Sequence, residues 1–205
     1  MKLVVFGGSG GVGRAAAAAA AARGDEVTVL ARRPSRVRLP PPVRVIEGDA
    51  LDAAAVAGAI SGQDAVLTAL GGRPWRDTDV CSRGTRHIVD GMGQHGVRRL
   101  VAVSSIGIGD SRRHLGWLAR NVAVPLAMRR LFADKERMEE IVRASDLDWV
   151  IVRPALLTSG RPRGSWRVAL DGSIHGGFIT RGDVAAFCVV QLGSDEYLRQ
   201  APSLA

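Results

Sequence analysis

The stretch that decides the fold runs from Leu3 to Arg23 and reads LVVFGGSGGVGRAAAAAAAAR. It begins with four apolar residues, continues through a seven-residue loop that contains five glycines, and then has eight consecutive alanines. An unbroken apolar run is typical of a strand buried on both faces, and alanine is the best helix former. We therefore predict a β-strand over Leu3–Phe6, a glycine-rich turn over Gly7–Gly13 and an α-helix over Arg14–Arg23.

Short apolar runs alternate with helical stretches along the rest of the chain. Further strands are predicted at Val27–Leu30, Val43–Ile46, Ala65–Ala69, Leu100–Val103 and Val150–Val152. Further helices are predicted at Ala53–Ile60, Ser82–His95, Asp134–Ala144 and Asp183–Gln191. This alternation predicts an α/β fold, a doubly wound parallel sheet with right-handed crossovers. The 205 residues fit one domain over residues 1–205.

The composition excludes several classes of protein. Apolar residues make up 46% and charged residues 23%, which is ordinary for a globular chain and unlike a disordered one. The net charge of +8 comes almost entirely from arginine, because Lys2 and Lys135 are the only lysines. The arginines are spread along the chain without a long basic block, so we expect no nucleic-acid partner.

The sequence contains no segment or residue cluster that indicates a membrane, a secretory route or a metal site. No apolar stretch approaches the ~18 residues that a membrane helix needs, and no signal-peptide layout is present. We expect a cytoplasmic protein without a membrane partner, either monomer or homodimer. Cys81 and Cys188 are too isolated for a disulfide framework, and the four histidines lack partners at ligand spacing, so no metal is expected.

The glycine-rich loop has the flanks of a phosphate-binding turn. Two registers fit, either Gly7, Gly10 and Gly13 at three-residue spacing, or Gly8, Gly10 and Gly13 as G-x-G-x-x-G. Glycine lets backbone N–H groups approach a diphosphate, and a helix N-terminus adds about half a positive charge. We predict that the loop binds the diphosphate of a dinucleotide, as in the Rossmann fold.

The end of the second predicted strand indicates which dinucleotide binds. An NAD site usually has an acidic residue there, about 20 residues beyond the glycines, for the ribose 2′-hydroxyl. This chain has Arg32 instead, with Arg33 and Arg36 close by. Guanidinium groups suit a 2′-phosphate, so NADP(H) is the predicted cofactor. Asp49, after the third strand, either borders the adenine or caps the next turn.

These motifs occur in an order that resembles a known family. They are Gly7–Gly13, Val27–Arg32, Gly48-Asp49, Leu70–Gly72, Ser104-Ser105, Asp146–Pro154 and Ile179–Ala185. The chain resembles the atypical short-chain dehydrogenases/reductases, and among them the NAD(P)H-binding, NmrA-like group that includes flavin reductase/biliverdin reductase B. The resemblance covers nearly the whole chain and is specific for cofactor and fold, much less so for substrate.

The resemblance implies roles for individual residues. Gly7, Ser9, Gly10, Gly11 and Val12 would hold the diphosphate, Arg32 and Arg36 the 2′-phosphate, and Asp49 and Ala50 would flank the adenine. Leu70 and Gly71 would line the cofactor beside the fourth strand, Ser105 would face the nicotinamide, and Pro154, Ala155 and Leu156 would close over its carboxamide.

The catalytic residues of the wider superfamily are only partly present. Its members typically use Tyr-x-x-x-Lys, but Leu131 stands four residues before Lys135, and the only tyrosine is Tyr197. Lys135 matches the family lysine that holds the nicotinamide ribose, or is a helix-surface charge. Ser104 and Ser105 either orient a carbonyl or carboxamide, or bond to backbone at the strand end. Ser105 and Lys135 are the catalytic candidates.

Two irregular stretches, about residues 107–130 and 158–177, are predicted to border a small-molecule substrate. The first carries five arginines against Asp110, which fits either an anionic substrate or a basic outer helix. Trp117 either stacks on a flat ring or packs on the core. Trp117 and Leu157 are the predicted substrate contacts.

The main hypothesis is an NADPH-dependent reductase of a planar electron-accepting molecule, such as a flavin, quinone or tetrapyrrole. Hydride chemistry belongs to the cofactor, and such acceptors can take their proton from solvent, so a missing tyrosine is compatible with it. The first alternative is an NmrA-like sensor or scaffold that binds NADP(H) without turnover. The second is a redox-neutral isomerase or cyclase.

Overall fold

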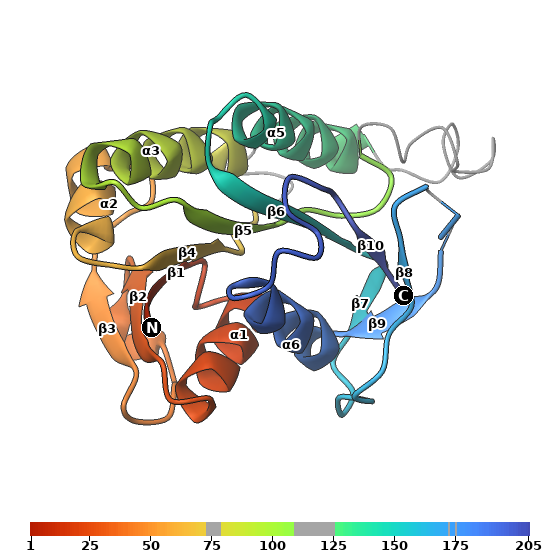
Figure 1. Ribbon diagram of the computed structural model, residues 1–205, viewed down its shortest axis with the longest axis horizontal. Helices are drawn as coiled ribbons and strands as arrows, with labels where there is room; N and C mark the ends of the chain where they lie inside the picture. The colour runs from red at the N-terminus through yellow and green to blue at the C-terminus, as the bar shows by residue number, and fades with distance from the viewer. Residues whose placement is uncertain (73–78, 109–125, 172, 175) are drawn as a thin grey trace.

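The molecule is built around one mostly parallel sheet of eight strands (Figure 1). The computed structural model describes residues 1–72, 79–108, 126–171, 173–174 and 176–205. The strands are β3 (Arg44–Glu47), β2 (Glu26–Ala31), β1 (Lys2–Phe6), β4 (Ala65–Thr68), β5 (Arg99–Val103), β6 (Asp148–Pro154), β10 (Ser203–Leu204) and β8 (Val168–Ala169), in that spatial order. All neighbours are parallel except β10 and β8, which confirms the predicted doubly wound α/β fold.

Helices cover both faces of the sheet (Figure 1). The described helices are α1 (Gly11–Ala22), η1 (Pro34–Arg36), α2 (Ala53–Ile60), α3 (Val80–His95), α5 (Leu126–Arg143) and α6 (Arg181–Gln191). Helices α1 and α6 pack against each other on one face, and α2, α3 and α5 form a row on the other. None of these helices is long and apolar enough to cross a lipid bilayer.

Strand β1 shows why the sequence has unbroken apolar runs. Leu3 and Val5 belong to the core cluster that includes α1 and α6, whereas Val4 and Phe6 belong to the cluster that includes α2 and α3. All four side chains are fully buried. Because successive side chains of a strand point to opposite faces, a central strand between two helical layers has to be apolar at every position.

The structure adds elements that the sequence did not indicate. Strands β7 (Leu156–Thr158) and β9 (Phe178–Thr180) form a separate two-stranded parallel sheet. Strands β8 and β10, each two residues long, are added at one edge of the main sheet. These strands are too short to show a periodic pattern. Helix α5 begins at Leu126, eight residues before the predicted start at Asp134, so the predicted irregular stretch 107–130 overlaps its first turns.

Candidate functional site

A cavity of about 610 Å³ lies beyond the carboxyl ends of strands β1 to β6. This is the edge at which doubly wound sheets bind their ligands. The predicted residues that line it are Gly7, Ser9, Gly10, Gly11, Val12, Arg32, Asp49, Ala50, Leu70, Gly71, Ser104, Ser105, Lys135, Pro154, Ala155 and Leu157. The fold therefore brings together the glycine-rich loop, the arginine after β2 and the serines after β5.

The glycine-rich loop is a tight turn that tolerates no side chain at its ends. Gly7 has φ +80°, and a Cβ atom there would lie 2.4 Å from the carbonyl oxygen of Ala69. A Cβ on Gly13 would lie 2.4 Å from the carbonyl oxygen of Gly7. The N–H of Gly10 donates to that same carbonyl oxygen at 2.9 Å. Gly13 thus serves the packing of the turn and is outside the cavity lining.

Helix α1 begins without a side-chain cap. The Arg14 N–H makes the first helical bond, to the Gly10 carbonyl oxygen at 2.9 Å, so the N–H groups of the first three helical residues lack acceptors within the helix. By contrast, Asp52 caps α2, Thr180 caps α6, and Asp134 of α5 accepts from two N–H groups at the start of α3. The start of α1 is therefore suited to bind an anion.

The adenine side of the cavity combines one arginine with one acid. Arg32 follows β2, is exposed and lines the cavity. Arg33 and Arg36 are also exposed but are outside the lining, because the chain turns away into η1. Asp49 lines the cavity, and its carboxylate accepts from the N–H of Leu51 at 3.0 Å. The two roles considered for Asp49, bordering the cavity and closing a turn, are compatible.

The opposite end of the cavity is lined by polar side chains that make hydrogen bonds to groups in the protein interior. The Ser104 hydroxyl donates to Oε1 of Glu139 at 2.6 Å, and Lys135 Nζ donates to the Val103 carbonyl oxygen at 3.1 Å. Ser104 is buried, whereas Ser105 and Lys135 are half-buried. Because the Ser104 proton points toward Glu139, the serine oxygen presents its lone pairs as acceptors to a ligand N–H.

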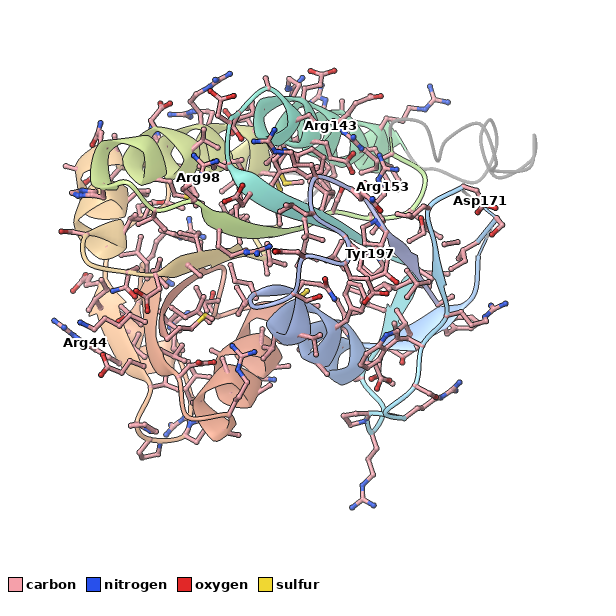
Figure 2. All side chains as sticks on the ribbon, in the orientation of Figure 1. Arg44, Arg98, Arg143, Arg153, Asp171 and Tyr197 are labelled. Carbon is pink, nitrogen blue, oxygen red and sulfur yellow. The ribbon has the colours of Figure 1, made fainter. Side chains whose placement is uncertain are left out.

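Glu139 and Arg153 form a buried ion pair behind Ser104. Both residues are 3% exposed. The guanidinium of Arg153, which is labelled in Figure 2, donates to the Glu139 carboxylate through Nε at 3.0 Å and through Nη2 at 2.6 Å. Arg143 adds a longer contact of 3.6 Å to the same carboxylate and lies over the Trp149 ring. The pair joins α5 to β6 and holds the Ser104 hydroxyl in one orientation.

Only one of the two leucines of β7 that were expected at the cavity lines it. Leu157 lines the cavity, whereas Leu156 is 67% exposed and is outside the lining. Strand β7 alternates its side chains, and pairing of Leu157 with Ile179 turns this residue inward. The predicted closure of Leu156 over a carboxamide therefore does not match the structure, and Leu157 occupies the inward position.

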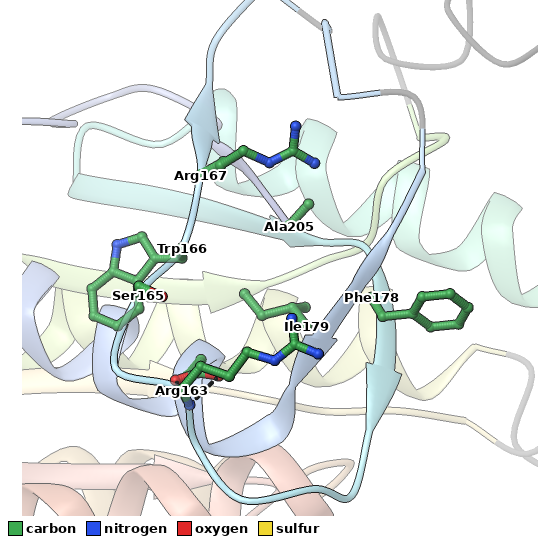
Figure 3. A pocket seen from close by; sticks show the side chains of 8 residues that line it. Arg163, Ser165, Trp166, Arg167, Phe178, Ile179 and Ala205 are labelled. Carbon is green, nitrogen blue, oxygen red and sulfur yellow. Dashed lines mark hydrogen bonds between the residues drawn. The ribbon is translucent and has the colours of Figure 1, made fainter.

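A second cavity, of about 420 Å³, lies beside β9 and the start of α6 (Figure 3). Its floor includes Asp183, which accepts from the backbone N–H groups of Arg163 and Gly164 and from the Thr180 hydroxyl. Burial tends to raise the pKa of Asp183, but these hydrogen bonds outweigh it and lower the pKa below its usual value. The carboxylate thus holds the 163–164 loop against α6.

Two aromatic residues considered in the sequence analysis remain, Tyr197 and Trp117. Tyr197 is half-buried and packs against the hydrophobic core, with its ring centroid 5.7 Å from that of Phe187, and desolvation raises its pKa (Figure 2). It is not part of the cavity lining. Trp117 falls within residues 109–125, which lie outside the described residues. Its predicted contact with substrate stays a prediction.

Three residues of the site were missed from the sequence. Glu139 and Arg153 are charged residues within apolar or amphipathic stretches, and no local spacing shows that they pair across the fold. Arg181, the first residue of α6, lines the cavity beside Gly11 of the glycine-rich loop. It lies in the segment Ile179–Ala185 that carried part of the family resemblance, which was the available signal.

Comparison with known proteins agrees with this geometry. Residues 7–195 match the model of the family described as NAD(P)H-binding. The chain belongs to the NAD(P)H-binding family. The uncapped helix start and the glycine turn provide what the diphosphate of a nicotinamide dinucleotide requires, so the described residues fit the cofactor of this family.

Several members and structural neighbours are similar over the whole chain. An uncharacterized chloroplastic protein of Arabidopsis thaliana is 26% identical over 95% of this chain and 73% of its own length. The anaerobilin reductase ChuY of Escherichia coli has a TM-score of 0.83 and 26% identity, over 100% of this chain and 96% of its own. A short-chain dehydrogenase/reductase of Veillonella parvula, solved with NADP, has a TM-score of 0.82 and 16% identity, over 100% and 94%. The match over residues 7–195 confirms the predicted resemblance to an NAD(P)H-binding family.

Within the NAD(P)H-binding family, this chain shows no metal centre in its described part. No group of three or more histidine, cysteine, aspartate or glutamate side chains is placed to hold a metal ion among the described residues. The two cysteines are buried and unpaired with each other, and burial raises the pKa of Cys188 to about 12.

Proposed function

We propose that this protein is an NADPH-dependent reductase of a planar, electron-accepting small molecule such as a flavin, quinone or linear tetrapyrrole. The single observation that carries the proposal is the cavity itself. The cavity extends from Arg32 past the uncapped start of α1. At its other end it is lined by Ser104, Ser105, Lys135 and Leu157. A bound nicotinamide cofactor supplies a hydride at its nicotinamide ring.

The preference for NADPH follows from charge. Arg32 is the arginine of the 32–36 stretch that lines the cavity, and a guanidinium group can make two charge-assisted hydrogen bonds to a phosphate. No acidic side chain from the end of β2 takes this position in the lining, since β2 ends in Ala31 and is followed by Arg32. The 2′-phosphate of NADPH therefore gains an interaction that NADH cannot make.

Among the described residues, those that line the other end of the cavity position the ligand and include no histidine, tyrosine or carboxylic acid. Ser104 offers an acceptor oxygen, and Ser105 and Lys135 present a hydroxyl and an ammonium group to the same space. Tyr197 packs beside Phe187 outside the cavity lining, so it cannot donate a proton there. A conjugated acceptor that takes its proton from water suits these residues better than a ketone or aldehyde, whose reduction needs an acid positioned at the carbonyl oxygen. ChuY, 26% identical, is described as an anaerobilin reductase.

The test is a screen of NADPH oxidation with FMN, a soluble quinone and biliverdin as acceptors, followed at the absorbance of reduced nicotinamide. We expect at least one acceptor to raise the rate well above the acceptor-free blank, and NADH to be a poorer donor. Binding of NADPH without any acceptor-dependent oxidation would contradict the reductase and favour the sensor or scaffold alternative. Turnover of a substrate without net change in NADPH would favour an isomerase or cyclase.

A further inference from the structure

The side chain of Arg181, the first residue of α6, lies against Gly11 at the start of α1. We propose that the guanidinium group of Arg181, oriented by Ser159, binds the cofactor diphosphate and holds it against the start of α1. This inference deepens the proposed cofactor site and rests on dinucleotide binding, but it does not depend on which substrate is reduced.

The first observation is the contact between Arg181 and Gly11. A Cβ atom on Gly11 would lie 2.4 Å from Cδ and 2.7 Å from Nε of Arg181. Gly11 has no positive φ that would itself require glycine. The absence of a side chain there makes room for the arginine, which brings its guanidinium group to the first residue of α1. Helices α1 and α6 are packed neighbours, so this approach is fixed by the core (Figure 1).

The second observation is the partner that orients Arg181. Its Nη1 donates to the Ser159 hydroxyl oxygen at 2.8 Å, and the bond uses one of the five N–H groups that a guanidinium carries. Arg181 is half-buried and lines the cavity together with Gly10, Gly11 and Val12. The arginine is thus held at the cavity wall and does not extend freely into solvent.

The third observation is the electrostatic situation at the start of α1. The first N–H groups of that helix have no side-chain cap, and a helix N-terminus carries about half a positive charge. A full positive charge from Arg181 beside it is unfavourable unless an anion lies between or beside the two. A diphosphate satisfies both, through backbone N–H groups on one side and charge-assisted bonds from the guanidinium on the other.

Arg181 also links two parts of the molecule. Ser159 directly follows β7, whose Leu157 lines the far end of the cavity, and Arg181 opens α6, which packs on α1. A diphosphate held by Arg181 would thus be connected through Ser159 to the small β7–β9 sheet. The substrate end of the cavity is formed in part by that sheet.

The test compares ligands that contain the diphosphate with one that lacks it. NADP⁺ and 2′-phospho-ADP-ribose contain the diphosphate, whereas adenosine 2′-monophosphate carries only the adenine end. For Arg181→Ala we expect affinity for the first two ligands to fall about tenfold to a hundredfold, the effect of losing a charge-assisted hydrogen bond. Affinity for adenosine 2′-monophosphate should change less than about twofold, which also reports that the variant is folded.

Matched variants separate the geometry from the charge. Arg181→Lys keeps the charge and should recover only part of the loss, and Ser159→Ala should weaken NADP⁺ about threefold. Arg161→Ala removes an exposed arginine from the loop after β7 and should leave binding unchanged. Gly11→Ala should weaken NADP⁺ in the wild-type background by displacing Arg181, and clearly less in the Arg181→Ala background.

The outcomes distinguish this inference from the proposed function. Unchanged NADP⁺ affinity in Arg181→Ala, with tight binding by the wild type, overturns the role of Arg181 and leaves the reductase standing. An equal loss for all three ligands also overturns it, because a diphosphate contact cannot act on a ligand without a diphosphate. Failure of the wild-type protein to bind NADP⁺ at all would contradict the cofactor assignment instead.

Discussion

Glu139 accepts the hydrogen bond of Ser104 at the inner end of the site, and its replacement should lower the free energy of unfolding. The carboxylate accepts three hydrogen bonds in the interior, one from Ser104 at 2.6 Å and two from Arg153 at 3.0 and 2.6 Å. Glu139→Ala removes the carboxylate that accepts two hydrogen bonds from the buried Arg153 guanidinium, and breaking a buried ion pair in this way costs about 3–5 kcal/mol. For a chain of this size we expect the Tm to fall by roughly 10 °C.

The assay is urea unfolding with linear extrapolation, applied to a mutant cycle. The double variant Glu139→Met with Arg153→Met removes both charges and keeps the volume, so it should be less destabilised than either single variant, and within about 1–2 kcal/mol of the wild type. Ser104→Ala serves as the control for loss of the hydroxyl bond alone, at about 1 kcal/mol. A Glu139→Ala cost below about 1 kcal/mol, or single costs that simply add in the double variant, would refute the reasoning.

Three further predictions concern the cofactor loop, its selectivity and acid stability. Arg32→Ala should weaken NADPH about tenfold or more and NADH little, because only NADPH has the 2′-phosphate; equal losses in titrations of both would contradict the assignment. Gly7→Ala should abolish cofactor binding and destabilise the fold by about 2 kcal/mol or more, because the new Cβ meets the Ala69 carbonyl and the φ of +80° disfavours a side chain; wild-type binding by this variant would exclude the described turn. Asp183 has a lowered pKa, so its contribution to stability is complete above the usual aspartate value of about 4 and is lost as the pH falls through the lower folded value. Asp183→Asn should therefore lower stability at pH 7 and make melting less dependent on pH below about 4, and identical pH profiles would count against it.

The sheet could be predicted because its signals are local. Residues Leu3–Phe6 are apolar at every position since both faces of β1 are covered, and the glycine loop follows directly. Arg32 could be predicted at the cavity for the same reason, because it directly follows the second strand at the edge of the sheet where ligands bind. Such features need only the order of residues and the geometry of a strand–turn–helix unit.

The remaining parts of the site depend on contacts that sequence order does not reveal. Glu139 and Arg153 are 14 residues apart on different elements, and their pairing follows from how α5 packs on β6. The inward side of β7 is decided by its pairing with β9, which is why Leu157 lines the cavity and Leu156 does not. Arg181 reaches Gly11 across 170 positions of sequence only because α1 and α6 are neighbours.

The central claim is that the cavity at the start of α1 binds NADPH through its diphosphate and its 2′-phosphate. Isothermal titration of the wild-type chain with NADPH and with NADH, under identical buffer and salt, tests it most directly. We expect one NADPH per chain, bound at least about tenfold more tightly than NADH. Absence of binding by either cofactor, or tighter binding of NADH, would contradict it.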